Sequence, residues 1–445
     1  MKIIIVGAGE VGTHLAKLLA RESMEITLSD ENPDRLMDLE SNYDLLTSVG
    51  SSTSINHLRE IGVENANLFI AVTPYESVNM TACMLATNLG AEKTLARIDN
   101  YEYLFPENKD FFKKLGVDYL IYPEVLAAKE ISESLKTSWL RQNMSFCNDA
   151  LILLGIKVRS NSEIINKKFS TGYFDHDKYR VVAIKRGMQT IIPKGSDEIL
   201  DNDIVYFITT PQYLNFVREQ AGKEDFPIKN VMFLGGSRIA QKTLKRLPDH
   251  IHTKVLEINN ERSMELAEKF PDTLIINCDG RNIDVLREEG IQEMDAFVAA
   301  TGNSEMNLLA CMVAKRFGVK KTIAEVENID YIPLAESMDI GTVINKKMIA
   351  ASYIYQITLN ASVLNVRNLT SADAEVVEFI AKAGSKITRS KIKNLKLPEN
   401  VNIGGIVRNG KGMIVSGETS IEPEDHVIVF CISSAIRKLE PFFNT

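Results

Sequence analysis

Hydrophobic residues along this chain alternate between short continuous runs and longer stretches with helical periodicity. An apolar run at residues 2–6 is followed by a periodic stretch at 10–21. Short buried runs separated by amphipathic helices are typical of parallel βαβ units. The further strands of this first region are expected at 25–29, 44–49, 68–72, 94–98 and 119–122.

The same pattern returns 228 positions later. Residues 58–97 align with 286–325 without a gap, and 16 of these 40 positions are identical. A long internal repeat indicates that one folding unit has been duplicated. The strands of the second copy are expected at 231–234, 254–257, 273–277, 296–299, 322–326 and 342–344.

Each copy is followed by shorter β-like runs and turns, such as LILLGIKV in the first half and HVIVF in the second. We therefore predict an α/β protein with two Rossmann-like parallel-sheet domains, each followed by a small α+β domain. The predicted boundaries are 1–140, 143–220, 229–360 and 366–445. Residues 211–227 are expected to form a linker, because they carry two prolines, a glycine and a charged run.

Composition narrows the class of protein. The chain has 445 residues, of which 45% are hydrophobic and 25% charged, as in ordinary globular proteins. A net charge of −8 argues against a general nucleic-acid partner, which would require a basic face. No apolar run approaches the roughly 18–20 residues that span a bilayer, so another subunit would supply any membrane spans.

Five scattered cysteines form no CxxC pair, so neither a zinc site nor a redox motif is indicated. Cys83 and Cys311 occupy equivalent positions in apolar helical patterns of the two copies. We expect both to pack in a core.

The strongest chemical signal is GAGEVG at 7–12, which leaves a strand and opens a helix. Gly7 permits a tight turn, Gly9 lets the backbone approach a pyrophosphate, and Gly12 allows close helix–strand packing. The helix start, at Glu10 and Val11, presents unpaired N–H groups to an anion. The motif therefore predicts a site for an adenine nucleotide or dinucleotide.

An acidic residue, Asp30, ends the second strand, where a ribose-binding carboxylate belongs. An acid here favours a free 2′-hydroxyl, and therefore NAD or ATP/ADP over NADP. The alternative is a glycine turn kept for packing, with Asp30 as a helix cap before Pro33.

The second copy departs from this pattern, since it reads GGSRIA at 235–240. Ser237 and Ala240 add small groups at the places of Gly9 and Gly12, and Arg238 could pair with a phosphate. A degenerate copy kept only for structure is the alternative. The candidate binding residues of the second site are Gly235, Gly236, Arg238, Ile239 and Glu257.

Polar residues also follow the third and fourth strands of each copy. Ser51 and Asp279 could line an adenine pocket, with helix capping as the alternative. Thr73 and Thr301, each followed by an asparagine, lie at the carboxyl edge of the sheet, where ligand contact and capping are both compatible with the pattern.

Arg97 ends the fifth strand and could pair with a phosphate group of the ligand. Its counterpart in the second copy is Glu325, so the two copies differ in charge at this position. A salt bridge within the protein is the favoured alternative for Arg97. No histidine recurs at an equivalent place, and no Ser/His/Asp, HExxH or P-loop lysine pattern can be read. We therefore predict neither catalytic residues nor metal ligands. An NAD-dependent oxidoreductase of the Rossmann type is the alternative.

Several segments resemble a known family. GAGEVG, LREIGVENANLFIAVT and NMTACMLA resemble the regulator-of-potassium-conductance (RCK) domain, also called KTN or TrkA-N. The segments NLKLPENVNIGGIVRNGKGMIVSGET and IEPEDHVIVF resemble TrkA-C. Two such N/C pairs in one polypeptide are the arrangement of the TrkA family of the Trk potassium uptake system.

The resemblance implies a cytoplasmic subunit, peripheral on the inner face of the plasma membrane. Such subunits usually form a homotetramer, or dimer of dimers, beneath a TrkH-type potassium-translocating subunit. They bind NAD(H) and ATP or ADP at the N-domains, and ligand exchange gates the pore. A stand-alone nucleotide sensor acting on another partner is a further alternative.

The resemblance carries over to Gly7, Gly9, Gly12 and Asp30. Ser51 departs from the acidic residue that the family often has in its loop, whereas Asp279 keeps it. Apolar-striped helices at 123–140 and 346–359 follow the sixth strands. In this family such helices cross to a partner domain, but the sequence alone also allows packing within their own domain.

Overall fold

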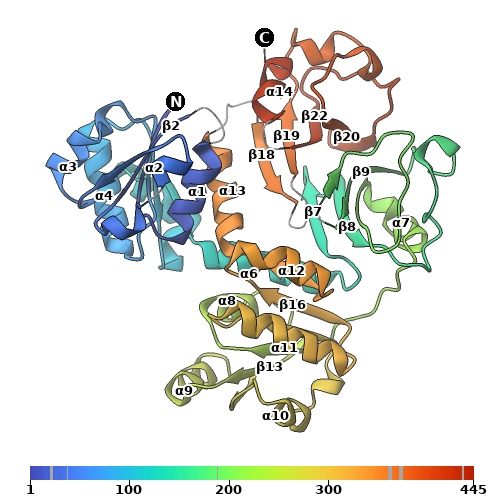
Figure 1. Cartoon of the computed structure of the whole chain (residues 1–445), viewed down its shortest axis with the longest axis horizontal. Helices are drawn as coiled ribbons and strands as arrows, with labels where there is room; N and C mark the ends of the chain where they lie inside the picture. Colours follow the sequence, from blue (N-terminus) through green and yellow to red (C-terminus); the bar gives the residue numbers. More distant parts are fainter. Residues whose placement is uncertain are drawn as a thin grey trace. The chain divides into compact units, whose positions relative to one another are not determined.

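The computed structural model describes residues 1–20, 24–37, 39–187, 189–358, 363–369, 374–432 and 435–444. The chain forms two compact units (Figure 1). The first comprises Met1–Leu126 and Lys346–Leu359, and the second comprises Ala127–Asn345 and Asn360–Thr445.

The first unit contains a six-stranded parallel sheet in the order β3-β2-β1-β4-β5-β6. The chain runs outward from β1 to β3 and then returns to the other side of β1, which places a switch point between β1 and β4. Ile3, Ile4 and Ile5 are fully buried, as expected for a strand covered on both faces. The strands are β1 (Lys2–Val6), β2 (Glu25–Asp30), β3 (Leu46–Val49), β4 (Leu68–Ala71), β5 (Thr94–Arg97) and β6 (Tyr119–Ile121). The helices are α1 (Glu10–Ala20), α2 (Leu39–Asn42), α3 (Ile55–Glu60), α4 (Glu76–Leu89) and α5 (Pro106–Lys114).

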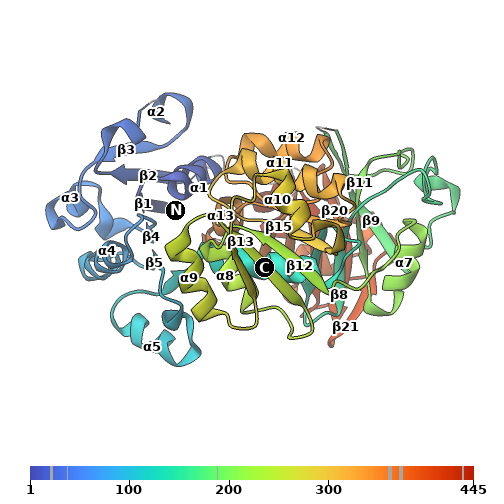
Figure 2. The same cartoon turned by 90° about the horizontal axis from the view of Figure 1, so that it is seen from below.

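The second unit repeats this sheet in the order β14-β13-β12-β15-β16-β17, with helices on both faces (Figure 2). The predicted α/β class, with two Rossmann-like parallel-sheet domains each followed by a smaller domain, is confirmed, and each smaller domain contains an antiparallel sheet. The strands are β12 (Asn230–Leu234), β13 (His252–Glu257), β14 (Leu274–Asn277), β15 (Ala296–Ala299), β16 (Lys321–Glu325) and β17 (Thr342–Ile344). The helices are α8 (Arg238–Leu244), α9 (Asn260–Lys269), α10 (Ile283–Glu288), α11 (Ser304–Arg316) and α12 (Ile332–Ser337).

Two antiparallel sheets, in the orders β10-β9-β11-β8-β7 and β18-β19-β22-β20-β21, complete the second unit. Their facing sides share one hydrophobic core, in which Leu151 and Tyr206 of the first sheet meet Val376 and Phe430 of the second. The first sheet comprises β7 (Gln142–Phe146), β8 (Leu151–Lys157), β9 (Tyr179–Arg186), β10 (Gln189–Ile191) and β11 (Ile204–Thr209). The second comprises β18 (Val363–Asn368), β19 (Glu375–Ile380), β20 (Val401–Arg408), β21 (Lys411–Ile414) and β22 (His426–Cys431), followed by helix α14 (Ile436–Phe443).

The segment 211–227, expected to be a linker, is partly helical. Helix α7 (Leu214–Gln220) buries Val217 completely, and Ala221 directly after it, in the core that also holds Phe207. The linker prediction is therefore wrong for this part. The prolines and charged residues indicated a linker, but the residues between them form a short apolar helix face that covers the first antiparallel sheet.

The helices that follow the sixth strands are exchanged between the two units. Helix α13 (Lys346–Thr358) follows the second parallel sheet but belongs to the first unit, where it packs against α1 (Figure 1). Helix α6 (Pro123–Lys136) follows the first parallel sheet, and its residues from Ala127 onward belong to the second unit. There the Ser134 hydroxyl lies 3.3 Å from that of Thr342 on β17. The sequence also allowed each helix to pack within its own domain. The structure shows the other arrangement.

Candidate functional site

The first glycine loop, between β1 and α1, is packed too closely for larger residues at two of its three positions. Gly7 has φ +101°, and a Cβ there would lie 2.8 Å from the amide nitrogen of Thr73. A Cβ on Gly12 would lie 2.0 Å from the carbonyl oxygen of Gly7. At Gly9 no atom lies within 4 Å of such a Cβ. Gly7 and Gly12 therefore fix the turn, while Gly9 leaves open space at the start of α1.

Helix α1 begins at Glu10, so its first N–H groups and the positive end of its dipole face this space. The Val11 side chain is buried in the core, so only its backbone can face a ligand. The Glu10 carboxylate pairs with the ammonium of Lys347, on helix α13. A helix from the second copy thus reaches the first candidate site.

Asp30 holds the glycine loop in place. Its Oδ2 accepts a hydrogen bond from the Ala8 amide at 2.7 Å, and its Oδ1 accepts one from the Asn32 amide at 2.8 Å. The turn that begins at Pro33 is capped by Asn32, so the capping alternative is wrong for Asp30. The carboxylate lies beside the loop, where a ribose contact would require it.

The loop after β3 rests on a buried histidine that sequence reasoning had not singled out. His57 lies 2.8 Å from the Ser29 hydroxyl, and a Cβ on Gly50 would lie 2.3 Å from the His57 ring. Ser51 lies 3.2 Å from the Thr53 hydroxyl, and Ser54 caps α3. The capping alternative is therefore wrong for Ser51. The glycine before it could have signalled that a side chain fills the space beneath the loop.

The ends of β4 and β5 are joined by a fully buried asparagine. Asn79 accepts a hydrogen bond from the Thr73 amide at 2.9 Å and donates one to the Arg97 carbonyl at 2.9 Å. The Arg97 guanidinium lies 3.3 Å from the carboxylate of Glu124, so Arg97 forms the ion pair that was its favoured alternative. Thr73 is thereby held at the carboxyl edge of the sheet, next to the glycine loop.

The second glycine loop is anchored in the same way. Gly235 has φ +91°. The buried Glu257 accepts hydrogen bonds from the amides of Gly236 and Asn259, both at 2.9 Å. Glu257 therefore takes the role of Asp30, although the aligned glycines differ.

The second loop is less open than the first. A Cβ on Gly236 would lie 2.2 Å from Cδ1 of Leu266, which covers the loop. The Ser237 hydroxyl caps α8 by accepting a hydrogen bond from the Ala240 amide at 3.4 Å. The side chain of Ile239 is buried, whereas that of Arg238 is exposed at the start of α8. The Ala240 amide, in the first turn of α8, thus already has a hydrogen-bond partner within the loop.

Two further candidates of the second copy have protein partners. Asp279 pairs with Arg281 at 2.6 Å, and hydrogen bonds from Arg281 lower the pKa of the Asp279 carboxyl. Asn282, not Asp279, caps α10, so the capping alternative is wrong here too. The Thr301 amide donates to the buried Asn307 at 3.1 Å, which repeats the arrangement of Thr73.

Glu325 is buried, whereas the side chain of Arg97, its counterpart in the first copy, is 21% exposed. Cys83 and Cys311 are fully buried, and burial raises the pKa of the Cys311 thiol to about 12. Their predicted packing role is confirmed.

One group of possible metal ligands was missed by sequence reasoning. Cys147, Glu378 and His426 bring one ligand atom each within 4.8 Å of one another. They come from both antiparallel sheets, so no short motif could have indicated them. In the structure Glu378 accepts from the Cys147 thiol at 3.1 Å and lies 2.8 Å from His426 Nδ1, which satisfies the buried carboxylate without a metal.

No helix within the described ranges is both long and apolar enough to cross a membrane.

Comparison with known proteins assigns the whole chain. The TrkA-N domain family matches residues 3–123 and 231–346, and the TrkA-C domain family matches 153–222 and 376–444. The Trk system potassium uptake protein TrkA of Vibrio alginolyticus is 32% identical over 458 aligned positions that cover 100% of both chains. The protein of the same name from Haemophilus influenzae is 32% identical over 97% of this chain and 95% of its own.

Solved structures share the fold at low identity. The structure described as "GsuK channel bound to NAD" has a TM-score of 0.60 and 13% identity, and the match covers 99% of this chain and 78% of that one. The structure described as "Crystal structure of the GsuK bound to ADP" has a TM-score of 0.51 and 11% identity, covering 80% and 68%.

Proposed function

This chain belongs to the TrkA family of Trk system potassium uptake proteins, and from that premise we propose that it gates a membrane potassium transporter in response to nucleotides. The chain is a regulatory subunit of potassium transport, and its relatives are named for potassium uptake, not for an enzymatic reaction. The proposed ligands are NAD(H) and ATP or ADP. The proposed partner is a TrkH-type subunit, with a homotetramer of this chain on the inner face of the plasma membrane.

The observation that carries the proposal is the pair of anchored glycine loops. In each copy a carboxylate at the end of the second strand accepts a hydrogen bond from the loop, at 2.7 Å from Asp30 to Ala8 and 2.9 Å from Glu257 to Gly236. Such loops present backbone N–H groups and a helix start to a pyrophosphate. The open space at Gly9 makes the first site the more accessible one.

Helix α13 supplies a route from ligand to motion. The first turn of α1 would hold the phosphates, and Glu10 in that turn is paired with Lys347 of α13. A ligand that shifts α1 therefore also acts on α13. Helix α13 follows β17 directly in the sequence, so it is connected to the second parallel sheet. A ligand changes such an equilibrium only by its differential affinity for the two states, and coupling of roughly 1–3 kcal/mol is usual.

The binding claim is tested by calorimetry with NADH and ATP on the wild type and on Gly9→Asp. We expect the variant to lose at least about tenfold in affinity, because a carboxylate at Gly9 would fill the open space and repel the phosphates. Gly195→Asp is the matched control, since the exposed Gly195 also has a negative φ and an added Cβ there would meet only Ser170 Cβ, at an ordinary 3.7 Å. Equal affinities for wild type and Gly9→Asp would refute the first site.

The partner claim is tested by co-purification from membranes with a potassium-translocating subunit, and by potassium uptake in cells that carry Gly9→Asp. Uptake that no longer responds to nucleotide levels is the expected result. A chain that binds nucleotides but never purifies with such a subunit would instead be a stand-alone sensor. Steady oxidation of NADH by the purified chain would favour an oxidoreductase.

A further inference from the structure

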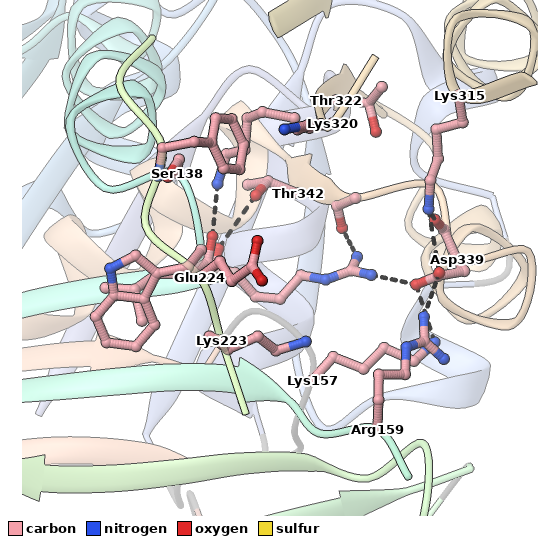
Figure 3. A pocket seen from close by; sticks show the side chains of 16 residues that line it. Ser138, Lys157, Arg159, Lys223, Glu224, Lys315, Lys320, Thr322, Asp339 and Thr342 are labelled. Carbon is pink, nitrogen blue, oxygen red and sulfur yellow. Dashed lines mark hydrogen bonds and ion pairs between the residues drawn. The ribbon is translucent and has the colours of Figure 1, made fainter. Parts of the chain in front are cut away.

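A cavity of 230 Å³ lies in the second unit, at the edge of the second parallel sheet where β16 and β17 begin. This is the opposite edge from the glycine loop, which follows the carboxyl end of β12. Its other wall comes from residues next to β7 and β8 of the first antiparallel sheet. Figure 3 shows charged side chains converging on it. The basic residues of the lining are Arg141, Lys157, Arg159, Lys223, Lys315, Lys320 and Lys321.

Only two acidic residues, Glu224 and Asp339, line the cavity beside these seven basic ones. Asp339 contacts Lys157 and Lys315 at 3.1 Å each and also pairs with Arg141 and Arg159. Although its burial acts in the opposite direction, these cations hold the pKa of Asp339 well below its usual range. One carboxylate thus serves four cations, and the cavity keeps a large excess of positive charge.

Three lysines of the lining, Lys223, Lys320 and Lys321, form no ion pair among the described residues. Lys223 is half-buried, has no ion pair or side-chain hydrogen bond there, and points into the cavity (Figure 3). Lys321 is only 4% exposed, and its ammonium donates to the neutral carbonyl of Leu140 at 2.5 Å. Burial, reinforced by Arg141, lowers the pKa of Lys321 to about 7. Burying ammonium groups without counter-ions is costly, so these side chains are poised to receive an anion.

The first copy does not have this cluster. Thr87 and Glu92 occupy the positions of Lys315 and Lys320. At the turn before the sixth strand, Gly116 with φ +86° stands where the second copy has Asp339 with φ +57°. A left-handed conformation is unfavourable for a residue with a Cβ, although aspartate tolerates it better than most. The fold itself therefore does not require these charges, and the second copy carries them at a conformational cost.

We propose that this cavity binds a multiply charged phosphate anion about the size of pyrophosphate, either free or as the phosphate tail of a nucleotide. Guanidinium and ammonium groups are the usual partners of phosphate oxygens, and arginine forks match phosphate geometry. A single carboxylate ligand would leave most of the positive charge unbalanced. The anion would bridge the second parallel sheet to the first antiparallel sheet, because both contribute to the lining.

The test is calorimetry of the full chain with inorganic pyrophosphate and, in parallel, with ADP. The variants are Lys223→Gln and the double variant Lys223→Gln/Lys320→Gln. We expect the double variant to lose about tenfold or more in pyrophosphate affinity, since a hydrogen bond to a charged group is worth that much. Lys93→Gln is the matched control, because the exposed Lys93 is the first-copy counterpart of Lys321.

Gly9→Asp separates this site from the first glycine loop. Pyrophosphate binding that survives Gly9→Asp but is lost in the double variant supports a free phosphate anion. If only ADP binding shows the lysine dependence, the occupant is a nucleotide tail. A structural role alone would not produce proton uptake on binding at pH 8, which we expect because a bound anion raises the pKa of Lys321 above about 7 and its neutral amine then takes up a proton.

Unchanged affinity for both anions in the double variant would overturn the proposal. The proposal would also be overturned if neither pyrophosphate nor ADP bound saturably to the wild type. That outcome does not depend on the thermal stability of the variants. Failure here leaves the proposed site at the first glycine loop untouched, because that site is tested by Gly9→Asp.

Discussion

At the scale of single residues, a buried polar side chain stabilises or destabilises the fold according to its hydrogen-bond partners. Asn79 and Glu257 are buried with hydrogen bonds to backbone groups, so each stabilises the loop that it holds. Lys321 is buried with one neutral acceptor, so its charged form is penalised. Burial of this second kind makes stability depend on pH.

We predict that Lys321→Met stabilises the chain more at pH 6.5 than at pH 9. Burial lowers the pKa of Lys321 in the folded chain to about 7, from an ordinary lysine value of 10.5. Between these values the unfolded chain binds a proton that the folded chain does not, so the contribution of Lys321 to stability rises with pH in this window. Below pH 7 the lysine is charged in both states and the full burial penalty applies.

The measurement is the free energy of unfolding of both proteins at the two pH values, without added phosphate. Lys93→Met, at the exposed first-copy position, is the control and should show no such pH dependence. A difference between Lys321→Met and wild type that is equal at both pH values would contradict the prediction.

At the scale of elements, helix α13 carries one continuous buried stripe. Its buried positions include Lys347, Ala350, Ala351, Ile354 and Tyr355, which recur with helical spacing. This stripe is covered within the first unit, which contains α1. The helix is therefore held by packing with a domain far away in the sequence.

We predict that Ile354→Ala lowers the free energy of unfolding by about 2–5 kcal/mol, because a fully buried isoleucine is replaced by a cavity. The matched control is Tyr353→Ala on the same helix, where the side chain is 37% exposed and the expected cost is smaller. Chemical denaturation measures both. Equal losses would show that α13 is not docked through this stripe.

At the scale of the whole molecule, the two halves of the chain do not fold as independent N/C pairs. The antiparallel sheets share one core, in which Leu153 of the first half lies with Ile428 of the second. Gly412 approaches the carbonyl of Ala150 so closely that a Cβ there would lie 2.0 Å from it. The exchange of α6 and α13 adds a second connection between the halves.

We predict that the halves remain associated after the chain is cut between them. A protease site inserted after Gly222, where the backbone leaves α7, would be cleaved without separation of the fragments in gel filtration. The reason is that separation would expose the shared core to water. A second site in the exposed β20–β21 turn at Gly410 is a control for cleavage. Fragments of about half the mass that elute apart under native conditions would contradict this view.

Several features could be predicted from the sequence because they are local. Strand positions followed from short apolar runs, and β1, β15 and β17 have the bounds that were predicted. The turn at Gly7 followed from glycine spacing, since steric limits on φ act within a few residues. Prediction of helix caps failed where two polar residues close in sequence could each cap the same helix. Asn32 is the cap in place of Asp30, and Ser54 is the cap in place of Ser51.

By itself the sequence determined the duplicated α/β pattern, the glycine loops and the acidic residues that follow them, because periodicity and steric constraints operate along the chain. Only the tertiary structure decided what covers each apolar stripe. A stripe on α13 specifies a buried face but not the partner that buries it. The charge cluster around Asp339 is another such case, because Arg141 and Asp339 are separated by 198 positions and meet only when two sheets pack together.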